Sequence, residues 1–112
     1  MPTFPENWTL YVEAVGVPII FQAVFTTGDT NESGTVTATG PLGATYSGTW
    51  SETPSPQGNS ITFSLTREGA SNTYQFSGFR VAYAMGGTFS GPASGGWSAC
   101  ASTPPTAQRE LD

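Results

Sequence analysis

Two arginines and one glutamate are the charged residues through which this chain could bind a ligand. Arg67, Arg80 and Glu52 each end a segment in which aromatic and aliphatic residues alternate with serine and threonine. An arginine guanidinium binds a carboxylate through two parallel hydrogen bonds. The sequence therefore allows a site for a carboxylate-bearing ligand. It also allows a simpler outcome, in which Glu52 and Arg80 pair with each other or reach out to water.

Covalent and metal chemistry lack their usual residues. The 112 residues include no histidine and no lysine, and Cys100 is the one cysteine. A serine or cysteine nucleophile needs a base, and a zinc site needs imidazole or several thiolates. The parity of its segment also turns Cys100 outward. We therefore identify no catalytic residue, no metal ligand and no cofactor. Acid–base chemistry by Glu52 or Glu13 stays open, and the residue set favours a non-enzymatic protein over an enzyme.

The segment 29–34 is similar to the first half of a calcium-binding loop, because oxygen-bearing side chains stand at alternate positions before Gly34. An EF-hand loop also needs a glutamate at its twelfth position, where this chain has Gly40, and a helix on each side. A polar link between two strands is the simpler interpretation of this segment.

Alternation of apolar and polar residues predicts the strands that would position these side chains. It is clearest over 60–80, where two alternating segments face each other across a five-residue link that contains glycine and asparagine. The same pattern predicts eight strands, at 8–15, 18–27, 35–39, 44–52, 60–67, 73–80, 83–90 and 96–101. Residues 1–101 are expected to form one domain, and residues 102–112 a tail without periodicity.

Composition and strand number together predict an all-β fold. Charged residues make up 10% of the chain, and its polarity comes instead from residues such as Thr and Ser, which suit sheets better than helices. Eight short antiparallel strands with tight links are expected to form a single up-and-down β-barrel, because closure removes exposed strand edges. A two-sheet β-sandwich is the alternative.

Charge and hydropathy disfavour some partners and leave the compartment open. A net charge of −5 disfavours nucleic acid and anionic membranes. No apolar run approaches the ~20 residues that a membrane-spanning helix needs, so we expect no membrane insertion. The first residues show no signal-peptide pattern. The protein is expected in the cytoplasm if Met1 is its native first residue, and outside it if a signal peptide has been removed.

Parity within the predicted strands indicates which side chains point into the barrel. The inward set is Trp8, Leu10, Val12, Phe21, Phe25, Tyr46, Trp50, Ile61, Phe63, Leu65, Tyr74, Phe76, Phe89 and Trp97. An eight-stranded barrel is just wide enough for its own side chains or for one small ligand, so a filled core and a small aromatic-lined cavity both stay open. The candidate ligand-binding residues are Trp8, Phe21, Trp50, Glu52, Phe63, Arg67, Tyr74, Phe76, Arg80, Tyr83 and Trp97.

Strand direction places the charged candidates at the two mouths of the barrel. Glu52 and Arg80 end strands that run in the same direction, so both are expected to point inward at one mouth, with Tyr83 nearby. Arg67 ends a strand that runs the other way. Its side chain is therefore expected to point inward at the opposite mouth.

The outer face of the first two predicted strands carries apolar side chains. Tyr11, Val15, Ile20 and Val24 share the outward parity. A cluster of exposed apolar residues marks a surface for a partner, which includes a second copy of the chain. The alternative is that the tail or a loop covers these residues.

Several short motifs combine an aromatic or aliphatic residue with Gly, Ser, Thr or Asn. They are Asn7-Trp8-Thr9-Leu10, Gly34-Thr35-Val36-Thr37, Ser47-Gly48-Thr49-Trp50, Asn59-Ser60-Ile61-Thr62-Phe63, Met85-Gly86-Gly87-Thr88-Phe89 and Gly96-Trp97-Ser98-Ala99. Together they resemble motifs of small lipocalin-like or streptavidin-like bacterial barrels of unassigned function. The lipocalin motif has a glycine two residues before its first tryptophan, where this chain has Glu6, and the polar set with which streptavidin binds biotin has no matching positions here. The resemblance implies a barrel with an interior site and names no ligand.

These observations lead to three hypotheses about function. The first is a non-enzymatic binding module that holds a small apolar or carboxylate-bearing ligand inside the barrel. The second is a structural or assembly protein, such as a virion or filament component, that uses its outer face and its tail. The third is a barrel cyclase that folds an apolar polyene-like substrate by shape and positioning, which needs no histidine.

Overall fold

The structure of this chain is a computed structural model, and it describes residues 6–14, 17–28 and 32–101. The eight predicted strands are confirmed, with small shifts at their ends. They are β1 (Asn7–Ala14), β2 (Val17–Thr27), β3 (Ser33–Thr39), β4 (Thr45–Thr53), β5 (Asn59–Arg67), β6 (Thr73–Val81), β7 (Ala84–Ser90) and β8 (Gly95–Ala101). A short 3-10 helix (Pro41–Gly43) lies between β3 and β4. The expectations for Val15, for 29–31 and for the tail 102–112 concern residues outside the described ones.

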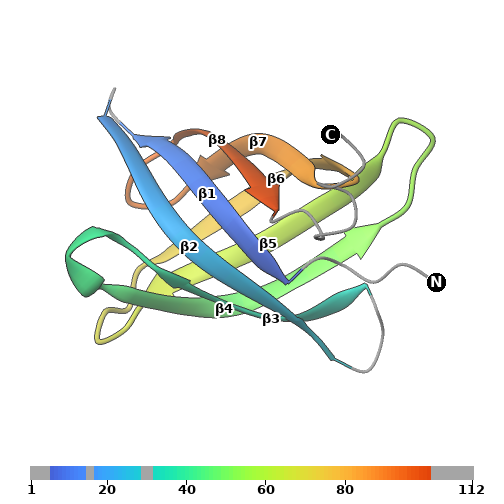
Figure 1. Cartoon of the computed structure of the whole chain (residues 1–112). Helices are drawn as coiled ribbons and strands as arrows, with labels where there is room; N and C mark the ends of the chain where they lie inside the picture. Colours follow the sequence, from blue (N-terminus) through green and yellow to red (C-terminus); the bar gives the residue numbers. More distant parts are fainter. Residues whose placement is uncertain (1–5, 15–16, 29–31, 102–112) are drawn as a thin grey trace, which may run out of the picture.

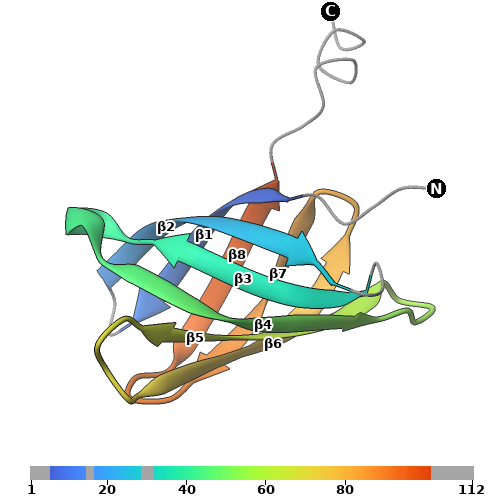
Figure 2. The same cartoon turned by 90° about the horizontal axis from the view of Figure 1, so that it is seen from below.

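The eight strands close into an up-and-down barrel, as the sequence predicts (Figure 1). Each strand pairs antiparallel with the next along the chain, and β8 returns to pair with β1, where Trp97 lies opposite Val12 and Ser98 lies opposite Tyr11. Seen from below, β3 and β4 lie in front of β7 and β8 (Figure 2). Because every described strand has a partner on both sides, the barrel has no free edge of the kind that a sandwich leaves.

Side chains of inward parity fill the interior. Every member of the predicted inward set is buried except Tyr46 and Tyr74, which are half-buried. The predicted set lacks Met85 and some smaller core residues, which are Ala23, Val36, Ala38, Ala99 and Ala101. Most of these lie in strands rich in Thr, Gly and Ser, where small apolar side chains give a weaker alternating signal.

Aromatic rings pack across the middle of the barrel. The ring of Phe63 stacks on Phe76 with centroids 4.5 Å apart, and it meets Phe25 and Trp97 edge to face at 5.3 and 5.1 Å. These are the two arrangements that aromatic pairs prefer. The buried indole also has its hydrogen bonds, because Trp97 Nε1 donates to a backbone carbonyl of β7 at 3.0 Å. The middle of the barrel is therefore a packed core.

Glycine is required at positions where neighbouring strands approach each other closely, as at Gly48 and Gly78. A Cβ added to Gly48 would lie 1.9 Å from the backbone oxygen of Ser64, and one added to Gly78 would lie 1.9 Å from that of Gly86. No side chain fits at such distances, so these two positions accept only glycine.

Replacing Phe63 with alanine should remove the ring at the centre of this packing and leave a cavity. We expect the free energy of unfolding to fall by about 3–5 kcal/mol, as for other buried phenylalanines. Urea denaturation followed by circular dichroism measures this loss. The matched control is Phe79→Ala on β6, because Phe79 is 55% exposed and its loss should cost about 0.5 kcal/mol or less. Equal losses in the two variants would contradict a packed aromatic core.

Candidate functional site

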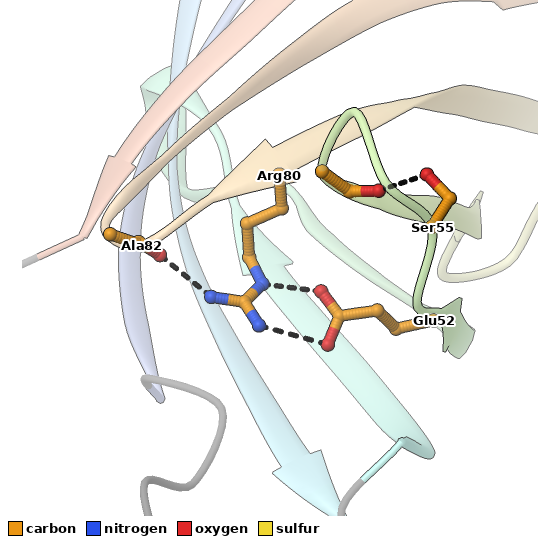
Figure 3. A network of polar contacts seen from close by, with 5 residues as sticks. Glu52, Ser55, Arg80 and Ala82 are labelled. Atoms are coloured by element: carbon orange, nitrogen blue, oxygen red, sulfur yellow. Dashed lines mark hydrogen bonds and ion pairs between the residues drawn. The ribbon is translucent and has the colours of Figure 1, made fainter.

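A buried ion pair closes the end of the barrel at which β4 and β6 finish (Figure 3). The Arg80 guanidinium donates to both carboxylate oxygens of Glu52, from Nε to Oε2 and from Nη2 to Oε1, the second at 2.9 Å. Its Nη1 donates to the carbonyl of Ala82 at 2.7 Å. The two side chains are only 4% (Glu52) and 15% (Arg80) exposed. Their predicted inward direction is confirmed, and of the two outcomes that the sequence left open, the structure shows the pairing.

The register of β5 brings these two charged residues together. Glu52 lies opposite Ile61, and Arg80 lies opposite Asn59, which is two residues away on the same face of β5. The carboxylate and the guanidinium therefore project over one strand from its two sides. Tyr83, which was expected nearby, lies in the turn after β6 and is 40% exposed. Since each carboxylate oxygen already accepts from the guanidinium, the pair forms a polar plug at this mouth.

The opposite end of the barrel holds an apolar cavity of about 90 Å³. The side chains that line it are Val12, Ala14, Ile19, Phe21, Tyr46, Leu65, Tyr74, Phe76, Phe89 and Ala93. The volume is smaller than the ~150 Å³ of an engineered apolar cavity that binds benzene. The cavity therefore suits the end of a slender alkyl chain better than a ring.

Two tyrosines bring polar atoms to this end cavity. Tyr46 meets Phe21 edge to face with ring centroids 5.2 Å apart, and Tyr74 lies against Phe89 at 6.3 Å. Within the described part of the chain, neither phenol hydroxyl has a hydrogen-bond partner. Both hydroxyls can therefore bind water or the polar end of a ligand.

Arg67 stands beside the end cavity as the last residue of β5, directly opposite Tyr46 in the register. Its predicted mouth is confirmed, but its side chain is exposed, which corrects the expectation of a guanidinium pointing into the interior. The strand ends here, and the chain turns with the Ala70 amide donating to the Arg67 carbonyl at 3.0 Å. Among the described residues Arg67 has no ion pair, and the adjacent Glu68 accepts from the Thr45 hydroxyl at 2.7 Å.

The remaining candidate ligand-binding residues are divided along the barrel axis. Those that line the end cavity are Phe21, Tyr74 and Phe76. Those buried in the middle or toward the plugged end are Trp8, Trp50, Phe63 and Trp97. Three residues that line the cavity are absent from the predicted inward set, namely Ala14, Ile19 and Ala93. The two alanines could be recognised by their small size, because an alanine leaves space at a level where neighbouring strands contribute rings.

The predicted apolar patch on β1 and β2 lies on the outer wall of the barrel. Tyr11, Ile20 and Val24 are 42%, 48% and 39% exposed, and Tyr11 lies directly opposite Ile20. Val15 falls outside the described residues. On the described strands, Glu13 is the one charged residue of outward parity. The described outer wall is therefore polar through hydroxyl groups much more than through charge.

In the described residues, no three His, Cys, Asp or Glu side chains gather to hold a metal ion. Among the same residues, no helix has the length and apolar character needed to cross a membrane.

Comparison with known proteins does not assign a family. No protein-family model, curated protein or solved structure matches the chain. The closed eight-stranded antiparallel barrel is consistent with the lipocalin-like architecture that the sequence motifs resemble. A fold of this kind hosts many functions, so function has to be inferred from the sites themselves.

Replacing Arg80 with methionine should leave the Glu52 carboxylate buried without its partner. Removing one member of a buried pair typically costs about 3–5 kcal/mol, and we expect a loss of that size in the free energy of unfolding. The double variant Glu52→Leu/Arg80→Met should recover most of it, because no buried charge remains. Arg67→Met is the matched control and should stay within about 0.5 kcal/mol of the parent. If the double variant is as unstable as Arg80→Met, the loss of stability does not come from an unpaired buried carboxylate, and this interpretation of the ion pair is wrong.

Proposed function

We propose that this protein is a non-enzymatic binding module, which takes the alkyl chain of a small carboxylate-bearing ligand into the end cavity beside Arg67. The observation that carries the proposal is that an apolar cavity and a guanidinium without an ion pair among the described residues lie at the same mouth. The register joins them, since Tyr46 lines the cavity and is the cross-strand partner of Arg67.

The size of the end cavity limits the apolar part of the ligand. A volume of about 90 Å³ accommodates a few methylene groups, each of which contributes about 0.8 kcal/mol when buried. This supports a short or medium-chain fatty acid as the ligand class. A polyene folded inside the barrel would need a much larger space, so the size gives no support to the cyclase hypothesis.

The polar groups at the mouth would orient the ligand with its carboxylate outward. Arg67 can form two parallel hydrogen bonds with a carboxylate, and the hydroxyls of Tyr46 and Tyr74 can donate to the same group. Hydrogen bonds to charged groups contribute about 1.5–3 kcal/mol, and exposure of Arg67 places its contribution toward the lower value. Together with the buried methylenes, this predicts a dissociation constant of about 0.1–1 mM for a single short chain.

Calorimetric titration with octanoate tests the proposal, with octanol as the same chain without a carboxylate. We expect octanoate to bind about tenfold more tightly than octanol. Arg67→Gln should remove this difference and leave octanol binding unchanged, because it deletes the charge and not the cavity.

The cavity itself is tested by a pair of variants in the link between β7 and β8. Ala93→Phe places a ring in the end cavity and should abolish binding of both ligands. Ser94→Phe adds the same ring at the next residue, which is exposed, and should leave binding unchanged. The proposal is wrong if the parent protein does not bind octanoate, or if Ala93→Phe binds it as well as Ser94→Phe does.

A further inference from the structure

A hollow of about 410 Å³ lies on the outer wall of the barrel, over β7, β8, β1 and β2. Tyr11 and Glu13 border it from β1, Pro18 borders it from β2, and Ser98 borders it from β8. Two glycines, one on β7 and one on β8, form part of its floor. The hollow is shallow and open to solvent, so it suits a ligand that binds by one face. The hollow is separate from the end cavity, since it lies outside the barrel.

Of the glycines in and beside this hollow, Gly96 is the one that the fold does not require. A Cβ added to Gly87 would lie 1.9 Å from backbone, and one added to Gly95 would lie 2.1 Å from it. A Cβ on Gly96 would come no nearer than 3.7 Å to any neighbouring atom, which is an ordinary contact, and Gly96 has no positive φ. Glycine weakens a strand relative to residues with side chains. Its effect at this position is to keep the floor of the hollow open.

We propose that this hollow binds the ring of a neutral pyranose sugar. Tyr11 is 42% exposed, and its ring offers a flat apolar surface on which the C–H face of a sugar can stack. The Glu13 carboxylate accepts hydrogen bonds from sugar hydroxyls, and the Ser98 hydroxyl can donate or accept. The register gathers these groups, because Ser98 lies opposite Tyr11 and Gly96 lies opposite Glu13. The open glycine is thus flanked by the aromatic surface and by both polar groups.

Charge favours a neutral sugar over other small ligands. Glu13 is the one charged side chain among the lining residues, and the chain carries a net charge of −5, so an acidic sugar would be repelled. A small organic cation would be attracted to Glu13. However, the single exposed ring of Tyr11 does not form the aromatic cage that such cations need. The Ser98 hydroxyl and the backbone groups of the hollow would also find no hydrogen-bonding partner on a cation such as tetramethylammonium. A sugar uses both the ring and the polar groups.

Saturation-transfer difference NMR with the methyl glycosides of glucose, galactose and mannose tests the proposal. We expect at least one of them to receive magnetisation from the protein and to bind with millimolar affinity. Tyr11→Ala should weaken that binding about tenfold or more. The matched control is Phe79→Ala, which removes another exposed ring, from the outer wall of β6, and should change the affinity less than about twofold.

Gly96 provides the second arm of the test. Gly96→Val should block the hollow and weaken sugar binding about tenfold or more, without lowering the melting temperature, because the fold has room for the side chain. Gly96→Ala should give a smaller loss. The proposal is overturned if none of the three glycosides binds, if Tyr11→Ala or Gly96→Val binds as the parent does, or if tetramethylammonium displaces the sugar. It is also overturned if light scattering shows a dimer that Tyr11→Ala dissociates, since the hollow would then be covered by a second copy.

Discussion

Aromatic packing through the middle of the barrel determines where the molecule has room for a ligand. Phe63 contacts Phe25, Phe76 and Trp97, and these rings come from four different strands. Their stacked and edge-to-face arrangements tie opposite walls together and fill the space that an eight-stranded barrel encloses. A ligand therefore has room only where the rings stop, at the end lined by Tyr46 and neighbouring apolar residues, or on the outer wall.

The two ends of the barrel differ because their arginines differ in depth. Arg80 meets the Glu52 carboxylate inside the mouth, where pairing offsets the cost of removing both charges from water. Arg67 is the last residue of its strand and stays exposed. An exposed guanidinium retains its water and can exchange it for the carboxylate of a ligand. The plugged end thus contributes to stability, whereas the apolar end has the features of a binding site.

Much of the fold could be predicted from the sequence, and the sites only in part. Strict alternation fixed the strands and the inward direction of Glu52 and Arg80, because parity needs nothing beyond the local pattern. The end cavity depends on where rings and alanines meet across several strands, which spacing does not show, so Ala14 and Ala93 were missed. The sequence does not distinguish Gly96 from the other strand glycines. Only the distances around each glycine in the structure show that Gly96 has room for a side chain. For Arg67, parity gave the correct mouth but not the exposure, which depends on where the strand ends.

The position of a bound alkyl chain tests the end cavity as a binding site most directly, and isotope-filtered nuclear Overhauser spectroscopy on labelled protein with unlabelled octanoate measures it. We predict contacts from the octanoate methyl group to the rings of Tyr46 and Tyr74 and to the Ala93 methyl group. We predict no contact with Trp8 or Trp50, whose indole rings pack against Phe25 and do not line the end cavity. Contacts to those two indoles, or a methyl group that touches only the outer wall, would contradict a barrel that is filled in the middle and open at one end.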